Sequence, residues 1–194
     1  PGQRIAVAND KAFSFIYPHI IDNWRFQGSE IFFFSPLNNE VPNQNVDFIW
    51  LPGGYPELYL EQISSANKTR INLIKLSEKV RIHGECGGYM VLGSEIIDCK
   101  GKHHNMFGLL NLVTSFEKKK LHLGYRLAKL KNKNNDLHNS KILRGHEFHY
   151  TTTIEQKDEE LYDVFDANNN KVSETGSFKN KVSGTFFHFL SVGQ

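Results

Sequence analysis

The stretch Val80-Arg81-Ile82-His83-Gly84-Glu85-Cys86-Gly87-Gly88-Tyr89-Met90-Val91-Leu92-Gly93 decides the fold. Its first four residues predict a short buried strand, and the residues after the glycine pair predict a helix. A Gly-x-Cys-x-Gly turn between a strand and a helix is typical of a nucleophile elbow, where flanking glycines prevent collisions with the neighbouring strand and helix. We therefore expect Cys86 to stand exposed on a tight turn.

The helix predicted after this turn gives the cysteine its chemistry. A helix N-terminus directs backbone N–H groups and the positive end of its dipole at the sulfur, which favours the thiolate, and the same groups can receive an oxyanion. Taken alone, the motif fits equally well a buried small residue whose glycines only permit the bend. Its position directly after a strand favours the functional interpretation.

A second glycine turn, Pro52-Gly53-Gly54-Tyr55-Pro56-Glu57, follows the apolar run 46–51. In parallel α/β sheets ligands bind beyond the carboxyl ends of the strands, so we expect both turns at one edge. The N–H groups of Gly54 and Gly87 could then form an oxyanion hole, which needs donors converging from separate segments. A bare Pro-Gly-Gly turn is also common as a structural connection.

A thiolate nucleophile needs a base, and the chain has nine histidines. His188 is the preferred candidate because it lies near the end of the apolar run 182–190, from which its ring could reach the elbow. Spacing alone leaves open a histidine that is held by local hydrogen bonds.

Strands alternate with helices in the first half of the chain. Such a β-α-β succession predicts parallel strands with helices on both faces of the sheet. Pro18 either breaks the first helix or sets its start. The expected strands are 4–8, 30–35, 46–51 and 80–83, and the expected helices are 13–27 and those within 58–79.

The second half differs in composition. The ranges 111–131 and 142–153 are rich in β-branched, aromatic and leucine residues, and the polar run 131–136 between them predicts a turn. We expect these segments to add antiparallel strands to the sheet. The run 182–190 is expected as one last strand.

Composition limits the classes of function. The chain has 194 residues, 39% of them apolar, which predicts one domain over 1–194. A net charge of +2 is too small to indicate a nucleic-acid or membrane surface. Neither a membrane-length apolar run nor a signal-peptide pattern is present, so a cytoplasmic protein is expected.

The remaining thiols and imidazoles carry weaker signals. Two cysteines in a chain of this size are expected to be reduced, leaving at least one free as a nucleophile. The pair His103-His104 is not part of a cluster with zinc-site spacing, so no metal is expected. Because the chain opens with Pro1 and stops at Gln194 soon after an apolar run, we expect an excised domain.

Five motifs occur in the order seen in one family of enzymes. The chain resembles, nearly end to end, the C-terminal glutaminase domain of cobyrinic acid a,c-diamide synthases, a class I glutamine amidotransferase domain of flavodoxin-like α/β fold with a mostly parallel central sheet. The stretch 145–150 is similar to the a,c-diamide synthases, whereas cobyric acid synthases tend to carry Tyr-Glu-Ile-His there. The motifs are Pro52-Gly53-Gly54-Tyr55-Pro56-Glu57, Gly84-Glu85-Cys86-Gly87-Gly88-Tyr89-Met90, Leu123-Gly124-Tyr125-Arg126, Arg144-Gly145-His146-Glu147-Phe148-His149-Tyr150 and Phe186-Phe187-His188.

The resemblance implies a division of labour. Cys86 and His188 would hydrolyse glutamine, and the ammonia would amidate the a and c acetate side chains of a corrin precursor. MgATP and the corrin would bind an N-terminal synthetase domain of the same polypeptide. No Gly-x4-Gly-Lys-Ser/Thr phosphate loop occurs here, so no cofactor is expected in this domain. A homodimer is a possible assembly.

One departure from the wider pattern concerns the third member of the triad. Most triad amidotransferases carry a glutamate two residues after the histidine, whereas this chain has His188-Phe189-Leu190. The cobyrinic and cobyric acid synthases share that gap, and Glu147 is a candidate replacement. Further candidates for the glutamine pocket or the domain interface, which sequence does not separate, are Gly53, Tyr89, His146, Glu147 and His149.

Two alternatives stay open. One is the glutaminase domain of a cobyric acid synthase-like enzyme, or of another amidotransferase that serves a different acceptor. The other is a binding or regulatory domain that keeps this fold and has lost catalysis.

Overall fold

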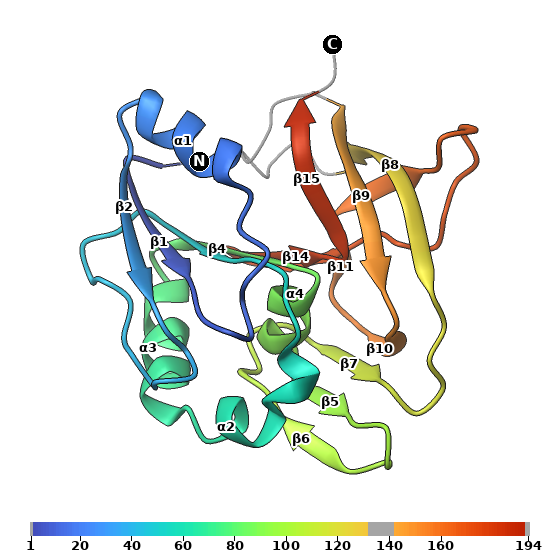
Figure 1. Ribbon diagram of the computed structural model, residues 1–194, viewed down its shortest axis with the longest axis horizontal. Helices are drawn as coiled ribbons and strands as arrows, with labels where there is room; N and C mark the ends of the chain where they lie inside the picture. Colours follow the sequence, from blue (N-terminus) through green and yellow to red (C-terminus); the bar gives the residue numbers. More distant parts are fainter. Residues whose placement is uncertain (1, 132–141, 193–194) are drawn as a thin grey trace.

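The computed structural model describes residues 2–131 and 142–192. A seven-stranded sheet with strand order β11-β13-β14-β4-β3-β1-β2 forms the centre of the molecule (Figure 1). The five strands from β14 to β2 are parallel, and β13 and β11 add antiparallel pairs at one edge. Its strands are β1 (Arg4–Ala8), β2 (Glu30–Phe34), β3 (Phe48–Leu51), β4 (Arg81–Glu85), β11 (Glu159–Glu160), β13 (Ser177–Lys179) and β14 (Val182–Thr185).

Helices cover both faces of this sheet. Side chains alternate between the faces of β1 and β3, so Ile5 and Trp50 pack with Ile21 of α1, whereas Ala6 and Ile49 lie in the core that includes α3 and α4. Pro18 is the first residue of α1, so of the two alternatives Pro18 sets the helix start, and the expected start at residue 13 is wrong. The helices are α1 (Pro18–Phe26), α2 (Leu60–Ser64), α3 (Asn67–Ser77) and α4 (Gly87–Leu92), with a 3-10 turn, η1 (Pro56–Leu58).

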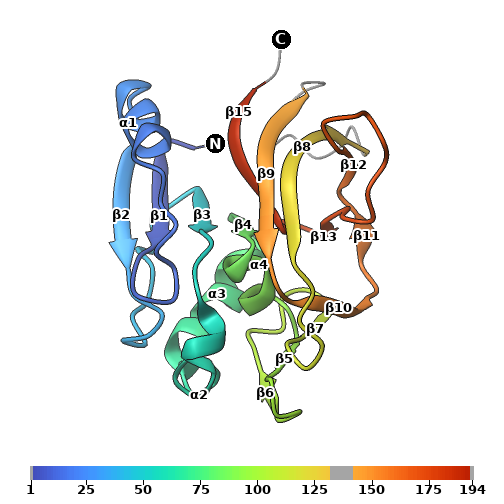
Figure 2. The ribbon, with the colours of Figure 1, turned by 45° about the vertical axis from the view of Figure 1, so that its right-hand side comes forward.

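Helix α4 lies in the middle of the molecule, and all six of its residues are buried (Figures 1 and 2). It follows β4 directly and packs against β3, β4 and β14. A Cβ added to Gly88 would lie 1.9 Å from the carbonyl oxygen of Leu51. Only glycine at this position lets the helix approach β3 so closely.

Most of the antiparallel strands form two small sheets of their own, with orders β10-β7-β5-β6 and β12-β8-β9-β15. The expectation that the segments 111–131 and 142–153 extend the central sheet is therefore wrong, and the antiparallel strands added to that sheet are β11 and β13, which lie outside those segments. Because β13 occupies the edge beside β14, the longer strands pair with one another instead. Their bounds are β5 (Glu95–Ile97), β6 (His103–Asn105), β7 (Leu112–Ser115), β8 (His122–Leu130), β9 (Leu143–His149), β10 (Thr152–Gln156), β12 (Tyr162–Phe165) and β15 (Phe187–Val192).

The run 182–190, expected as one strand, is two strands in two sheets. The break falls at Phe186, whose buried ring packs against Tyr89 and His149 with centroid distances of 5.2 and 4.0 Å. Strand β14 stays in the central sheet, and β15 pairs with β9 in the upright sheet seen in Figure 2. His188 therefore belongs to the second sheet and faces the end of the first.

Two other expectations concern membrane-spanning segments and a polar turn. None of the helices in the described ranges has the length and apolar character needed to span a bilayer. The polar turn expected at 131–136 falls almost wholly within 132–141, outside the described residues.

Candidate active site

Cys86 stands between the end of β4 and the start of α4, as the elbow motif predicts. Its φ of 48° and ψ of −106° place it in a backbone region that L residues rarely adopt. Its N–H donates to the carbonyl of Thr185 at 2.8 Å, and its own carbonyl accepts from the N–H of Met90 at 3.0 Å. The strained backbone is therefore held from both sides, by β14 and by the first turn of α4.

The thiol itself is covered rather than exposed. Cys86 is 3% exposed, and its Sγ donates to the carbonyl of Phe148 at 3.7 Å. Burial raises the pKa of the thiol, the hydrogen bond from the Gly87 N–H opposes that rise, and the negative charges of nearby glutamates add to it. The expectation of an exposed thiol is wrong for this structure, because the end of β9 covers the elbow. The helix N-terminus lowers the pKa of the thiol, as predicted, but the effect of burial is larger.

A small pocket opens beside Cys86, and both glycine turns meet there. A Cβ added to Gly87 would lie 3.1 Å from the backbone nitrogen of Gly54, so the two predicted oxyanion donors are neighbours. The turn after β3 and the elbow after β4 therefore share one edge of the sheet, as parallel topology predicts. The pocket is lined by Phe15, Gly54, Tyr55, Glu57, Cys86, Met90, Phe116, Phe148, His149 and Tyr150.

His188 lies at the same edge and is fully buried. Phe15, which lines the cysteine pocket, contacts the His188 ring with centroids 6.0 Å apart. A Cβ added to Gly53 would lie 2.4 Å from Cε1 of His188, so glycine is needed there to make room for the imidazole. Burial, together with the positive charges of His146 and His149, lowers the pKa of His188 to about 3, which keeps the ring neutral at neutral pH.

Glu85, which was not singled out in the sequence as a site residue, faces this imidazole. Its Oε2 lies 3.9 Å from Nδ1 of His188, and that oxygen has no hydrogen-bond partner among residues 2–131 and 142–192. Burial raises the pKa of Glu85 to about 8, and hydrogen bonds from the Phe189 backbone and the Trp50 side chain oppose that rise. The sequence signal that could have identified Glu85 is its position as an acidic residue inside a turn otherwise made of glycine and cysteine.

Glu147, the expected replacement for the missing triad glutamate, faces away from His188. In the β9–β15 pair His146 lies opposite His188 and Glu147 lies opposite Phe187, so strand alternation puts Glu147 on the other face of the sheet. Its carboxylate accepts from Nε of Arg126 at 2.7 Å and contacts Nε2 of His149 at 2.8 Å. These contacts do not support a role for Glu147 in orienting His188.

Comparison with known proteins identifies the family to which the chain belongs. Residues 4–193 match the CobB/CobQ-like glutamine amidotransferase domain. The chain belongs to that family. It is 48% identical over 98% of its length to a hydrogenobyrinate a,c-diamide synthase of Rhodobacter capsulatus, and 43% identical over its full length to one of Agrobacterium fabrum. The chain spans about 44% of the length of these curated relatives.

Solved structures show the same fold at low sequence identity. A glutamine amidotransferase from Thermotoga maritima superposes with a TM-score of 0.60 at 15% identity, covering 97% of this chain and 76% of that one. A second solved glutamine amidotransferase gives 0.61 at 13% identity, covering 95% and 89%. The expected class I glutamine amidotransferase fold, with a parallel-rich sheet and added antiparallel strands, is confirmed.

The three remaining candidates in this amidotransferase domain, Tyr89, His146 and His149, lie in different surroundings. Tyr89 is fully buried, and its hydroxyl bonds Ser177 and Gln156, so it is a core residue and does not line the pocket. His146 stacks on His188 with centroids 4.9 Å apart. His149 lines the cysteine pocket.

The candidate site also contains residues that the sequence did not single out. Tyr17 pairs with Nε2 of His146 at 2.8 Å and lies edge-on to His188. Burial, with the nearby charges of Glu85 and Cys86, raises the pKa of Tyr17 to about 12, so its hydroxyl stays protonated. Glu57 lines the cysteine pocket, and burial raises its pKa. Glu57 belongs to a recognised motif, whereas Tyr17 gave no signal because it precedes a helix in an ordinary aromatic stretch.

Proposed function

We propose that this domain is a glutaminase in which Cys86 is the nucleophile and His188 the general base. The observation that carries the proposal is a strained cysteine at a strand-to-helix turn, with a buried neutral imidazole at the same sheet edge. The backbone connects the two groups: Thr185, which accepts from the Cys86 N–H, ends the strand that leads into His188. Membership of the glutamine amidotransferase family supports glutamine as the substrate.

The proposed chemistry is acyl transfer in two halves. The thiol turns from the Phe148 carbonyl and passes its proton to His188 while sulfur attacks the glutamine carboxamide carbon. The N–H groups of Gly54 and Gly87 hold the oxyanion, and His188 returns the proton to the departing ammonia as the C–N bond breaks. His188 then takes a proton from water as the water oxygen attacks the thioester carbon, and it returns that proton to the Cys86 sulfur as the C–S bond breaks and glutamate leaves.

Glu85 takes the place of the missing third triad member in this proposal. Its carboxylate lies on the Nδ1 side of His188, so it can hold the tautomer whose other ring nitrogen is free to accept the thiol proton. When His188 becomes an imidazolium, an ionised Glu85 offsets the buried charge. Glu85 directly precedes Cys86 in the chain. The same tight turn therefore positions both the nucleophile and the residue that orients His188.

The acceptor of the ammonia is proposed from the relatives. Relatives at 43 to 48% identity are named hydrogenobyrinate a,c-diamide synthases, and this chain spans less than half of their length. We infer that ammonia passes to a synthetase domain of the same polypeptide, where MgATP activates the a and c acetate carboxylates of hydrogenobyrinic or cobyrinic acid. A cobyric acid synthase-like acceptor is distinguished by assaying which corrin carboxylates become amidated.

The test compares two nitrogen sources in the parent enzyme. Replacement of Cys86 by alanine should lower glutamine-dependent amidation by about 10³-fold or more, because the nucleophile is lost. Amidation from free ammonia should be unchanged. The matched control is Cys99→Ala, since Cys99 is the exposed free thiol. Equal loss of both activities in Cys86→Ala, or glutamine-dependent activity that survives it, would overturn the proposal.

A further inference from the structure

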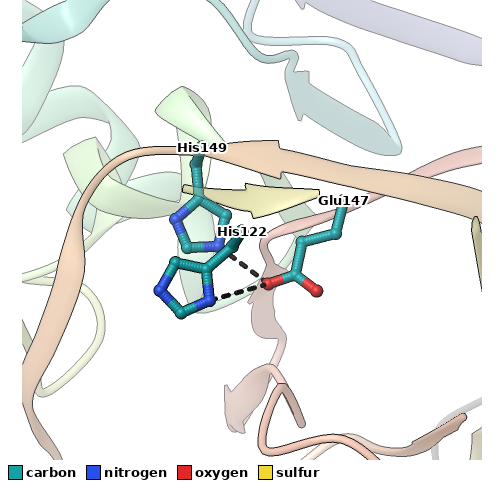
Figure 3. Close-up of side chains that lie close together, drawn as sticks. All are labelled: His122, Glu147 and His149. Atoms are coloured by element: carbon teal, nitrogen blue, oxygen red, sulfur yellow. Dashed lines mark hydrogen bonds and ion pairs between the residues drawn. The ribbon is translucent and has the colours of Figure 1, made fainter. Parts of the chain in front are cut away.

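Three potential metal ligands lie together on one face of the β8–β9 pair. His122 is directly opposite His149 in the strand register, and Glu147 lies two residues before His149 on the same face. Figure 3 shows both imidazoles turned toward a single carboxylate oxygen of Glu147. One ligand atom from each residue lies within 4.8 Å of the other two. The set is preorganised by backbone pairing rather than by a chance approach of surface side chains.

The contacts of His149 direct one of its ring nitrogens at the carboxylate. Nδ1 of His149 lies 3.1 Å from the carbonyl of Thr151, which accepts from an N–H. On the other side of the ring, Nε2 lies 2.8 Å from Oε1 of Glu147. Nε2 and Oε1 are therefore the two atoms that an ion bound in this cluster would contact.

The groups behind the cluster hold the ligands as a metal site requires. Oε2 of Glu147 accepts from Arg126 at 2.7 Å, which leaves Oε1 directed at the two imidazoles. The Thr151 carbonyl fixes the tautomer of His149. Such outer contacts orient metal-binding histidines and carboxylates in proteins. The positive charge of Arg126 partly offsets the negative charge of Glu147, so the affinity for a metal ion should be lower than with an unpaired carboxylate.

We propose that His122, Glu147 and His149 bind one divalent transition-metal ion, for which Zn²⁺ is the best match. Two imidazoles and one carboxylate form a ligand set that zinc accepts, with a fourth position left for water or another ligand. The cluster lines a hollow that also contains Gln156 and Glu174, through which an ion could enter. The ligands come from two strands far apart in sequence, which is why local spacing does not reveal the site.

The site would act on the amidotransferase centre without taking part in the acyl transfer. Glu147 lies on the opposite face of the sheet from His188. Phe148, between two of the ligands, supplies the carbonyl that accepts from the Cys86 thiol. A bound ion would therefore fix the end of β9 that covers the nucleophile and would stabilise the folded domain by mass action.

The test measures Zn²⁺ binding by calorimetry in a Cys86→Ser background, so that the thiol cannot be a ligand and glutamine hydrolysis plays no part. One ion per chain is expected, with at least about 10-fold weaker binding in both His122→Ala and Glu147→Gln. His122 is partly exposed and Glu147→Gln keeps the side-chain volume, so both should fold, which circular dichroism checks. The control His103→Ala, which removes an exposed histidine paired with Glu95, should bind as before.

Co²⁺ absorption of the unsubstituted chain gives a second measurement that does not depend on variants. Tetrahedral nitrogen and oxygen ligation should give visible d–d bands without a thiolate charge-transfer band. Absence of Zn²⁺ binding to the folded chain would overturn the proposal. Binding that survives both His122→Ala and Glu147→Gln, or a thiolate band with Co²⁺, would also overturn it. None of these outcomes bears on the glutaminase proposal, because Cys86 and His188 are outside the ligand set.

Discussion

Glu85 and His188 are two buried titratable groups whose pKa values move in opposite directions. Burial raises the pKa of the carboxyl to about 8 and lowers that of the imidazole to about 3, so each group is pushed toward its neutral form. Their facing atoms are 3.9 Å apart. When His188 takes the proton of the thiol, the resulting imidazolium is stabilised best if Glu85 is ionised. Glu85 is therefore a positioning residue whose ionisation should appear in the pH dependence of the reaction.

The corresponding prediction concerns the pH profile of glutamine hydrolysis. Below the pKa of Glu85 the carboxyl is protonated and cannot offset an imidazolium, so kcat/KM should rise as the pH increases through about 8. Replacement by glutamine, Glu85→Gln, should lower kcat by about 10²-fold or more and remove that rise. Glutamate release measured from pH 5 to 9 in both proteins checks this. An unchanged profile in the variant would assign Glu85 a purely structural role.

At the scale of elements, the site depends on how closely α4 approaches β3. Gly88 is the contact point, since an added Cβ would lie 1.9 Å from the Leu51 carbonyl oxygen. Backbone lies on both sides of this contact, so the helix would have to move, and the elbow at its N-terminus would move with it.

Gly88→Ala should therefore lower the free energy of unfolding by about 3 kcal/mol or more, as overpacking against backbone does. Gly28→Ala is the matched control, because Gly28 has φ 90° and open space around its Cα. That control should cost only the left-handed backbone strain of about 1 to 2 kcal/mol. Urea unfolding of both variants checks the difference, and equal effects would show that the close approach of α4 is unimportant.

The elements that the sequence predicted well are those with a clear apolar pattern. The run 4–8, the elbow strand and the helix beginning at Pro18 each carried enough buried residues to be recognised. Strands of two to four residues such as β11 and β13 are too short for a period to show. The break at Phe186 could not be predicted either, because a buried phenylalanine continues an apolar run while its ring anchors a change of sheet.

The site was predictable only where chemistry lay in local motifs. Cys86, Gly54 and Gly87 belong to glycine turns whose meeting point follows from parallel topology. The position of Glu85 beside His188 depends on where β15 runs after leaving the central sheet, and burial of the thiol depends on the Phe148 carbonyl. Neither relation is encoded in spacing along the chain.

At the scale of the whole molecule, segments from two of the three sheets meet around the elbow together with helix α4. The central sheet supplies the turns, the β8–β9–β15 sheet supplies the histidine and the cover over the thiol, and α4 lies between the layers (Figures 1 and 2). The proposed nucleophile is thus covered by the protein in this structure. Unspecific thiol reagents should react with exposed Cys99 before buried Cys86, whereas a ligand shaped like glutamine should reverse that order.

Covalent labelling with a glutamine-analogue electrophile, 6-diazo-5-oxo-L-norleucine, tests the central claim most directly. Peptide mass spectrometry should find one adduct on Cys86 and none on Cys99, with protection by excess glutamine. Labelling should be slower in His188→Ala by about 10²-fold or more, because the base that activates the thiol is lost. Labelling confined to Cys99, no labelling of the folded protein, or an unchanged rate in His188→Ala would contradict a Cys86–His188 glutaminase.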